Sequence, residues 1–417
     1  MSDRFRDATF LSLYQLASAS VYQAPLSSDS FHGVFMRRLP PFVYSALFLS
    51  LSAAASSFAQ ADDQVVRIGF AAPLTGPSAA DGKEMENAVR LAIDDANARQ
   101  PKLAGQAVKF ALVSQDDQSD PRIAAQIAQR FADSGVAGVV GHFNSSCSIA
   151  AARIYSDAGI AEVSPSSTGA AYTLQGYHTT FRVVGQDAVA GTTLANYLLD
   201  TLHAKRIAII DDQTDFGRGL AERVEQTLRG RYANIVARDY VNDKTIDFSA
   251  VLTKIRGVNP DVIVFGGFDA QAGQVVRRMR GLGVHATLAG EGFNNSIFID
   301  MAKGNGEGTV TIQPGTPPEK LPGRDFQTRY QVRFGAPLQG FQGPYAYDAA
   351  NVLIHAVLKA QSGEPVKVLA AVKTTSLSGT TGPIRFDTNG DLAGSPYTVY
   401  RLTGSNWQDV AVINSQR

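Results

Sequence analysis

Short apolar segments alternate with amphipathic segments along most of this chain, and this alternation restricts the possible folds more than any other feature. In a first series, the predicted strands lie at 65–70, 108–113, 136–140 and 160–163. Between the first two, apolar residues recur at helical spacing from Met85 to Ala96, which predicts a helix. Because a strand–helix–strand unit sets its strands parallel, we expect a parallel sheet with helices on both faces.

A second series of the same kind follows Val183. Its predicted strands lie at 206–210, 235–241, 261–265, 286–289 and 309–313, with helical segments between most of them. Two successive series predict two lobes, and a chain of 417 residues is too long for one ordinary core. The predicted fold class is therefore α/β, with two doubly wound parallel-sheet lobes joined by a three-strand hinge.

The last part of the chain departs from the alternation. Three helices are predicted at about 324–334, 344–360 and 365–373, followed by a hairpin whose strands are 383–386 and 397–402. We expect the helices to cover the first lobe and the hairpin to join the second. The first lobe would then comprise 62–183 and 316–382, and the second 184–315 and 383–417. This division makes the chain cross between lobes three times.

The N-terminal segment has the pattern of an export signal. Met36, Arg37 and Arg38 precede an apolar run at 42–51, and the sequence AQA at 59–61 fits a cleavage site. A basic start, a short apolar core and small residues at the cleavage site are typical of a secretory signal peptide. We therefore expect a leader over 1–61 with the signal peptide at 36–61. Residues 1–35 fit either a start at Met36 or an extended leader.

Charge and cysteine content exclude several classes of partner. The 38 basic and 38 acidic residues balance, so no excess of positive charge favours nucleic acid or an anionic membrane surface. Cys147 is the single cysteine, so neither an intrachain disulfide nor a cysteine-based zinc or redox motif can form. We expect no cofactor and no metal.

Polar residues follow two neighbouring predicted strands of the first series. The segments 141–147 and 164–168 both begin where an apolar strand ends, and both are rich in serine. Parallel sheets bind small ligands beyond the carboxyl ends of their strands. Hydroxyl donors without a strong nucleophile favour capture of a small anion over its conversion. The alternative is that Ser145 and Thr168 only cap helix N-termini.

An enzyme is a second alternative, because His142 lies close to Ser145 in the sequence. A nucleophilic serine needs a base within hydrogen-bond reach, an orienting group and an oxyanion hole. No G-x-S-x-G turn surrounds Ser145. We therefore expect a binding protein and keep a secreted α/β enzyme as the rival.

Seven short segments in order give the chain a family resemblance. They are PLTGP (73–77), GHFNSS (141–146), SPSST (164–168), DFGRG (215–219), FGGF (265–268), GEG (290–292) and GPYAYD (343–348). With these segments the chain resembles the type I periplasmic solute-binding proteins, and within them the branched-chain amino acid binders of ABC importers. The resemblance runs from about Val65 to the C-terminus. It implies a monomeric periplasmic receptor, not an enzyme, that delivers an amino acid to an inner-membrane permease.

The resemblance also implies which residues bind the ligand. The α-carboxylate would meet Ser145, Thr168 and the backbone at Ser166, and the α-ammonium would meet Glu291 on the second lobe. Hydroxyl and amide donors to a carboxylate form strong, charge-assisted hydrogen bonds. The remaining wall would come from Phe216 and Phe268.

The chain departs from the family pattern at two places. Family members often carry tyrosine where this chain has Phe216 and Phe268, and an aromatic residue in the loop that is SAA here at 78–80. Phenylalanine can stack on a ligand but cannot donate a hydrogen bond to it. These changes leave room for an alternative ligand, an amide, urea or aromatic acid, taken up for import or sensing.

Overall fold

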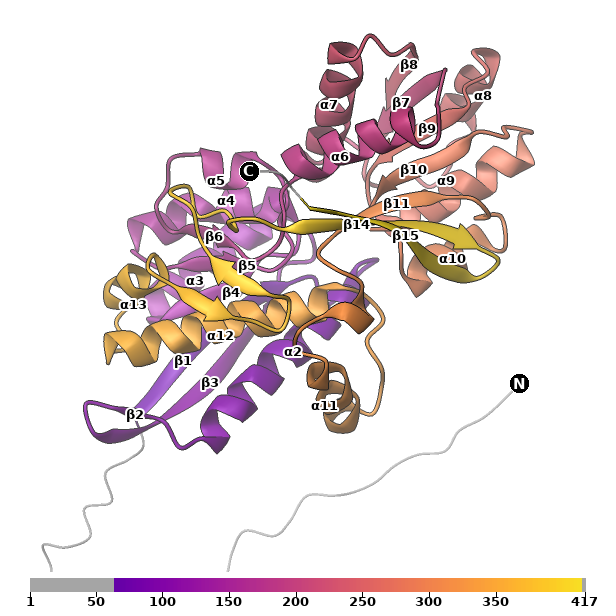
Figure 1. The fold of residues 1–417 in the computed structure, drawn as a ribbon. Helices are drawn as coiled ribbons and strands as arrows, with labels where there is room; N and C mark the ends of the chain where they lie inside the picture. The colour runs from indigo at the N-terminus through magenta and orange to yellow at the C-terminus, as the bar shows by residue number, and fades with distance from the viewer. Residues whose placement is uncertain (1–63, 415–417) are drawn as a thin grey trace, which may run out of the picture. The chain divides into compact units, whose positions relative to one another are not determined.

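The computed structural model describes residues 64–414. The predicted leader over 1–61 and its signal peptide at 36–61 lie outside these residues. Within them the chain forms two large sheets and one two-stranded sheet (Figure 1). Both large sheets consist mainly of parallel strands, which confirms the predicted α/β class with two sheet-centred lobes.

The first sheet has the strand order β2-β3-β1-β4-β5-β6. Its strands are β1 (Gln64–Ala72), β2 (Lys102–Leu103), β3 (Gln106–Asp116), β4 (Gly138–Gly141), β5 (Glu162–Ser164) and β6 (Thr180–Arg182). The four strands predicted for this series are all present. Only β2, a short edge strand, pairs antiparallel to its neighbour.

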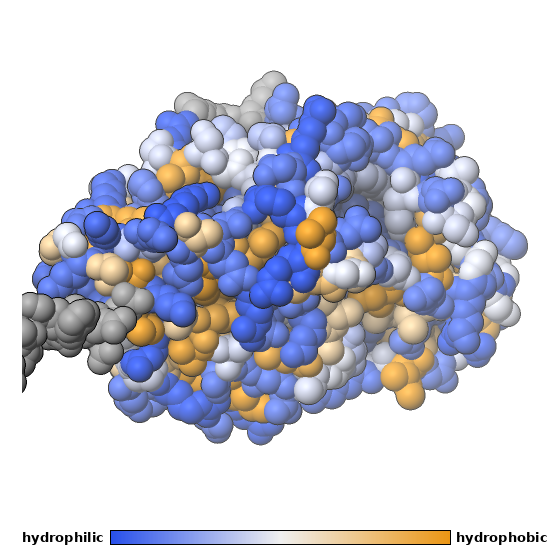
Figure 2. All heavy atoms as spheres, turned by 90° about the horizontal axis from the view of Figure 1, so that it is seen from below, coloured by the Kyte–Doolittle hydropathy of each residue, from blue (hydrophilic) through white to orange (hydrophobic). Residues whose placement is uncertain are grey.

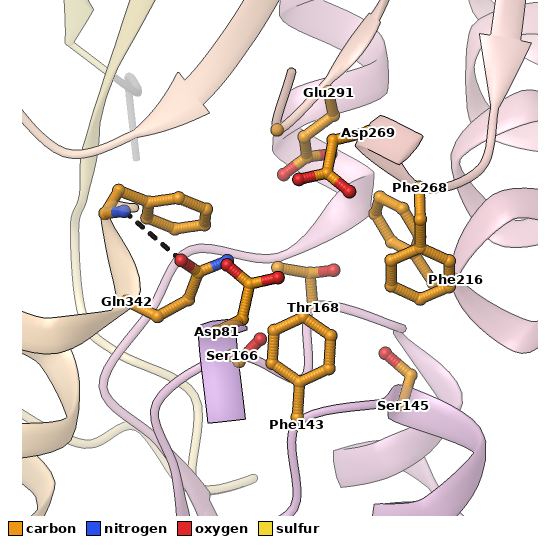
Figure 3. A pocket seen from close by; sticks show the side chains of 12 residues that line it. Asp81, Phe143, Ser145, Ser166, Thr168, Phe216, Phe268, Asp269, Glu291 and Gln342 are labelled. Atoms are coloured by element: carbon orange, nitrogen blue, oxygen red, sulfur yellow. Dashed lines mark hydrogen bonds between the residues drawn. The ribbon is translucent and has the colours of Figure 1, made fainter. Parts of the chain in front are cut away.

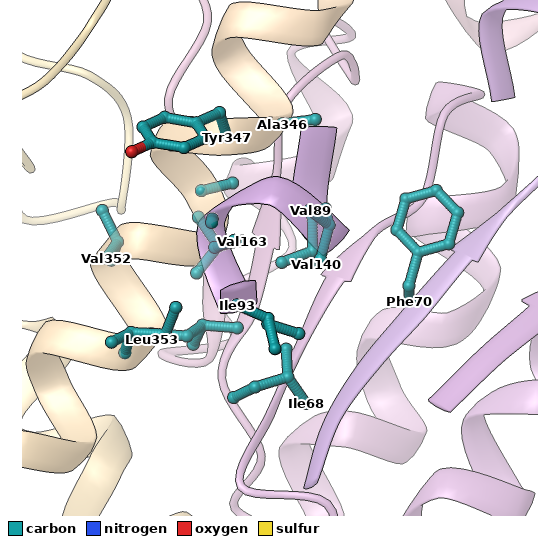
Figure 4. Packing of buried hydrophobic residues seen from close by; sticks show 14 of the residues in the cluster. Ile68, Phe70, Val89, Ile93, Val140, Val163, Ala346, Tyr347, Val352 and Leu353 are labelled. Atoms are coloured by element: carbon teal, nitrogen blue, oxygen red, sulfur yellow. The ribbon is translucent and has the colours of Figure 1, made fainter. Parts of the chain in front are cut away.

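Helices cover both faces of the first sheet, because successive residues of its strands point to opposite faces. On one face, Ile68 and Phe70 of β1 pack with α2 (Ala79–Ala98), α11 (Asp325–Phe334), α12 (Gln342–Ala360) and α13 (Pro365–Val372). Figure 4 shows this packing, with Ile93 of α2 near Leu353 of α12. On the other face lie α3 (Pro121–Ser134) and α4 (Ser145–Asp157). The three C-terminal helices therefore cover the first sheet, as the sequence predicts.

The start and end of α3 follow from its sequence. The Asp120 side chain accepts a hydrogen bond from the backbone N–H of Arg122 at 2.8 Å, and Pro121 occupies the first helical position. A proline there costs nothing, because the first helical N–H has no partner within the helix. Gly135 ends the helix with φ of 65°, a conformation that glycine adopts without steric cost.

The second sheet has the strand order β15-β14-β11-β10-β9-β7-β8. Its strands are β7 (Ile207–Asp211), β8 (Ile235–Tyr240), β9 (Val262–Gly266), β10 (Thr287–Glu291), β11 (Val310–Pro314), β14 (Pro396–Thr403) and β15 (Asn406–Asn414). On one face lie α6 (Asp187–Asp200) and α7 (Asp215–Gly230), and on the other α8 (Ser249–Gly257), α9 (Asp269–Gly281) and α10 (Ser296–Ala302). The five strands predicted for the second series are all present.

The predicted C-terminal hairpin is wrong. Strand β13 (Pro383–Arg385) pairs with β12 (Ser376–Ser378), and its Ile384 packs in the core of the first sheet. Strand β14 instead lies between β11 and β15, antiparallel to both. The segment 387–391 closes its own turn, in which the N–H of Asp387 donates to the carbonyl of Asp391 at 2.9 Å. The two predicted strands therefore pair with other neighbours. A tight turn joins β13 to β12, and another joins β14 to β15.

Helix α6 and strand β15 are among the elements that were not predicted. Small residues such as Ala190, Gly191 and Ala195 fill much of the buried face of α6, which obscures the apolar spacing of a helix. In β15, exposed residues such as Gln408 and Asp409 interrupt the apolar ones at an edge of the sheet.

The chain passes between the two large sheets three times, after β6, after β11 and between β13 and β14 (Figure 1). After β11 it continues through a short 3-10 helix, η1 (Pro318–Lys320), into the helices of the first sheet. Hydrogen bonds hold these passages. The Tyr345 hydroxyl donates to the carbonyl of Pro314, and the Tyr397 hydroxyl donates to the carbonyl of Gln186. The residue limits of the lobes themselves stay a prediction.

On the face drawn in Figure 2, apolar residues are interspersed with polar ones. Exposed large apolar side chains of the described residues include Tyr232, Ile246 and Val332, each more than four-fifths exposed. Within residues 64–414, no helix combines the length and the apolar character needed to cross a membrane.

Candidate ligand-binding site

A pocket that is partly open to solvent lies beyond the carboxyl ends of strands of both large sheets (Figure 3). All six residues predicted from the sequence line it, namely Ser145, Ser166, Thr168, Phe216, Phe268 and Glu291. The residues that the sequence analysis missed are Asp81, Phe143, Asp269, Gly292, Phe341 and Gln342. Parallel strand ends from two sheets therefore supply one shared cavity.

Hydroxyl groups form the side of the pocket that belongs to the first sheet. Ser145 is the first residue of α4, immediately after the N-cap residue Asn144, and is 2% exposed. Its Oγ accepts a hydrogen bond from the backbone N–H of Gly169 at 3.0 Å. Ser145 thus joins its own helix start to the next strand-end loop, which carries Ser166 and Thr168. Capping of α4 by the Ser145 side chain, the alternative interpretation, is not what the structure shows.

A buried arginine fixes the backbone of the loop that carries Ser166 and Thr168. Arg182, at the end of β6, is fully buried and donates from Nη1 to the carbonyl of Ser167 at 2.6 Å. Its Nη2 donates to the carbonyl of Gly169 at 3.0 Å, and its Nε to Oδ1 of Asp391 at 2.6 Å. Because a guanidinium presents its donors in a fixed planar fork, these contacts fix the backbone on both sides of Thr168.

Three phenylalanine rings form one wall. The ring of Phe268, from the start of α9, lies 5.2 Å from that of Phe216, from the start of α7. It also stacks with Phe143, from the loop after β4, at 6.0 Å between centroids. Rings from both sheets thus provide an apolar surface for an aliphatic or aromatic group. Phe143 lies inside the GHFNSS segment, so its position in that segment could have indicated from the sequence that it lines the pocket.

Glu291, the last residue of β10, is a buried acid without a partner. It is 3% exposed, and neither carboxylate oxygen accepts a hydrogen bond from any described residue. Burial raises the pKa of its carboxyl well above the usual value, and nearby Asp187 raises it further. Burial also raises the pKa of Asp187 to about 7, opposed by Thr168 and Arg182. The charged form of Glu291 therefore needs a cation that residues 64–414 do not supply.

Two further acids, Asp81 and Asp269, line the same pocket. Asp81 lies in the first turn of α2 and is 6% exposed, and Asp269 is the first residue of α9. Burial raises the pKa of both carboxyls, and the charge of Asp269 raises that of Asp81 further. Each acid lies near the start of a helix that follows a strand end, as Ser145 does. The same pattern could have identified them from the sequence.

Phe341 and Gln342 reach the pocket because Glu84 fixes their segment. The buried Glu84 carboxylate, on α2, accepts backbone N–H bonds from Gln339 at 2.5 Å, Gly340 at 3.0 Å and Gly343 at 3.2 Å. A sequence of more than 250 residues separates Glu84 from this segment, so no local pattern could have indicated the contact.

The geometry around His142 does not form a catalytic dyad with Ser145. Its Nδ1 lies 2.7 Å from Oδ2 of Asp117, and its Nε2 lies 3.2 Å from the hydroxyl of Tyr155. Both ring nitrogens are therefore engaged within the core. Cys147 is also buried, and burial raises the pKa of its thiol. Among residues 64–414, no cluster of three or more His, Cys, Asp or Glu side chains could hold a metal ion.

Comparison with known proteins identifies the family. Residues 65–406 match the model of a family described as periplasmic binding protein. The leucine-specific-binding protein of Salmonella typhimurium is 32% identical over 363 residues, which cover 86% of this chain and 96% of that protein. The Leu/Ile/Val-binding protein homolog 1 of Brucella suis is 30% identical over 365 residues, covering 86% and 95%.

A solved structure agrees with these relatives. The leucine binding protein LivK of Thermotoga maritima is 26% identical and superimposes with a TM-score of 0.76, over 84% of this chain and 99% of that one. Fold, strand-end pocket and sequence similarity over most of the length coincide. This chain belongs to the periplasmic binding protein family, as a type I member related to the branched-chain amino acid binders.

Proposed function

We propose that this protein is the substrate-binding component of an ABC importer that captures an α-amino acid, branched-chain or similar, in the pocket between its two sheets. It would deliver the amino acid to an inner-membrane permease as a monomer in the periplasm. Relatives named for leucine and for Leu/Ile/Val binding support this assignment. The family is one of solute-binding proteins and not of enzymes.

The unpartnered carboxylate of Glu291 is the observation that carries the proposal. It faces the same pocket as the hydroxyls of Ser145, Ser166 and Thr168, which come from the other sheet. An α-amino acid has a carboxylate for the hydroxyl side and an ammonium for Glu291. Both ends of the zwitterion would then be paired, and the buried charge of Glu291 would be neutralised by a hydrogen-bonded cation.

This division of contacts also gives a mechanism for capture. The ligand's carboxylate would bind residues after β4 and β5, and its ammonium a residue at the end of β10. A ligand that touches both lobes makes its full set of contacts only when they approach each other. It therefore shifts the equilibrium toward the closed state, by as much as its affinity differs between the two states.

The same observation disfavours the alternative ligands. A urea, a simple amide or an aromatic acid carries no ammonium group, so Glu291 would remain buried without a cationic partner. With such a ligand the carboxyl would keep the protonated form that burial favours, so binding would gain no ion pair at Glu291. The phenylalanine wall accommodates an aliphatic side chain as well as an aromatic ring.

Replacing Glu291 by glutamine tests the proposal. The substitution keeps the size of the side chain and removes its charge, and we expect leucine affinity measured by calorimetry to fall at least about a hundredfold. Glu222→Gln, at an exposed position on α7, is the matched control and should bind as the wild type does. A wild type that binds no α-amino acid, or leucine affinity that is unchanged in Glu291→Gln, would contradict the proposal.

A further inference from the structure

Asp81 and Asp269 are two further acids in the pocket that holds Glu291. Asp81 comes from α2 on the first sheet and Asp269 from α9 on the second, and both carboxylates point into the cavity (Figure 3). The charge of Asp269 acts on Asp81, whereas the charge that acts on Glu291 is that of Asp187. The pocket therefore contains three acids, of which Asp269 and Asp81 act on each other.

No basic side chain of the described residues neutralises Asp81 or Asp269. The charged groups that act on Asp81 are Asp269 and Glu84, both acidic. No hydrogen bond from the described part of the chain reaches the Asp81 carboxylate, although the residue is 6% exposed. Asp269 accepts hydrogen bonds only from uncharged donors, the backbone N–H of Ala270 at 2.7 Å and the side-chain amide of Asn295.

The lining of the pocket adds no cation. Its 12 residues include three acids and no lysine, arginine or histidine. A zwitterionic ligand with an apolar side chain would pair Glu291 through its ammonium and the hydroxyls through its carboxylate. Asp81 and Asp269 would then remain as two neighbouring buried acids, and like charges in one site oppose ionisation of both. One positive charge between them would let both ionise.

We propose that the preferred ligand carries a second cationic group at the end of its side chain, bound between Asp81 and Asp269. This inference rests on the proposed function for the α-carboxylate and α-ammonium, but it replaces a branched apolar side chain by one with a terminal amino or guanidino group, as in diaminocarboxylic acids and their guanidino analogues. The methylene chain would pack against Phe143 and Phe268, whose rings face the same cavity. Aromatic faces also attract a cation that passes close to them.

The test compares lysine with norleucine, which has the same number of side-chain carbons but no terminal ammonium. By calorimetry at pH 7.5 and low salt, we expect the wild type to bind lysine at least tenfold more tightly than norleucine. Asp81→Asn and Asp269→Asn should each bring the ratio of lysine to norleucine affinity close to one, because an amide of equal size loses only the charge. Asp157→Asn, at an exposed position on α4, is the control and should keep the preference.

Two results would overturn the inference, and a third would also remove its basis. Norleucine binding as tightly as lysine would overturn it, as would a preference for lysine that persists in both variants. If neither amino acid nor leucine binds to the folded wild type, the proposed function itself fails. Thermal unfolding of each variant shows whether it is folded, and we expect loss of either buried acid to leave the melting temperature unchanged or higher.

Discussion

Arg182 and Asp391 form a buried ion pair, with 2.6 Å between Nε and Oδ1, although 209 positions separate them in the chain. Arg182 ends β6, where the chain first leaves the first sheet, and Asp391 lies in the third passage, before β14. The same guanidinium binds the carbonyls on both sides of Thr168. One side chain therefore connects two of the three passages to the loop that we propose binds the ligand carboxylate.

Replacing Arg182 by methionine should strongly destabilise the protein. The substitution leaves the Asp391 carboxylate and two loop carbonyls buried without their donor. Breaking a buried pair by removing one partner costs about 3–5 kcal/mol, and we expect a loss of this size in the free energy of unfolding measured with urea. The control is Arg153→Ala, whose ion pair with Asp157 is more than 70% exposed on both sides and should contribute less than about 1 kcal/mol. Equal losses in the two variants would contradict the structural role of Arg182.

Asp187 should make the ligand-free protein less stable as the pH rises from about 4 to about 7. Burial raises the pKa of its carboxyl from 3.8 to about 7, so the folded state binds a proton that the unfolded state has released. Stability falls with pH wherever the folded state binds more protons. The full effect is on the order of 4 kcal/mol, since one pKa unit corresponds to about 1.4 kcal/mol.

The check is the free energy of unfolding of Asp187→Asn at pH 4.5 and pH 7.5. Relative to the wild type, the variant should lose less stability between the two values, because asparagine does not titrate. Glu291, Asp81 and Asp269 also have raised pKa values and should leave a residual slope of the same sign. A slope identical to that of the wild type would show that Asp187 is already ionised at low pH.

The contact between Gly217 and Gly266 should not tolerate a side chain. A Cβ atom on Gly266, the last residue of β9, would lie 2.1 Å from the carbonyl oxygen of Gly217 in the first turn of α7. Such overpacking typically costs about 1–3 kcal/mol, and we expect Gly266→Ala to lose that much stability on urea unfolding. Gly230→Ala at the end of α7 is the control, because its Cβ would meet no atom within 4 Å.

Truncating Phe268 should weaken binding of amino acids with apolar side chains more than it affects stability. Phe268 is half-buried at the pocket wall, where its ring stacks with that of Phe143 and packs at a tilt against that of Phe216. Burying a side chain of this size contributes about 1.5–3 kcal/mol, so Phe268→Ala should lower leucine affinity roughly tenfold or more by calorimetry. Phe334→Ala, which removes a half-buried ring at the end of α11 away from the pocket, should leave leucine affinity unchanged.

Most strands and the main helices were predictable, because the evidence for them is local. The spacing of apolar residues along β1 and α2, and the cap at Asp120 and Pro121, depend on neighbours within a few positions. Strand-end positions likewise identified Ser145 and Thr168, since parallel strands place their carboxyl ends at one edge. Phe216, Phe268 and Glu291 were identified through short family segments.

The sequence by itself thus determined the α/β alternation, the two lobes and one set of pocket residues. The tertiary structure alone decided that β14 pairs with β11 and not with β13, that Glu84 fixes the segment at 339–343, and that Arg182 meets Asp391. It also brought Asp81 and Asp269 from different sheets into one cavity. The spacing of apolar residues indicates which face of a helix or strand is buried, but it does not indicate which distant segment packs against that face. That choice depends on packing and hydrogen bonding between segments that are distant in the sequence, because buried polar groups need hydrogen-bond partners.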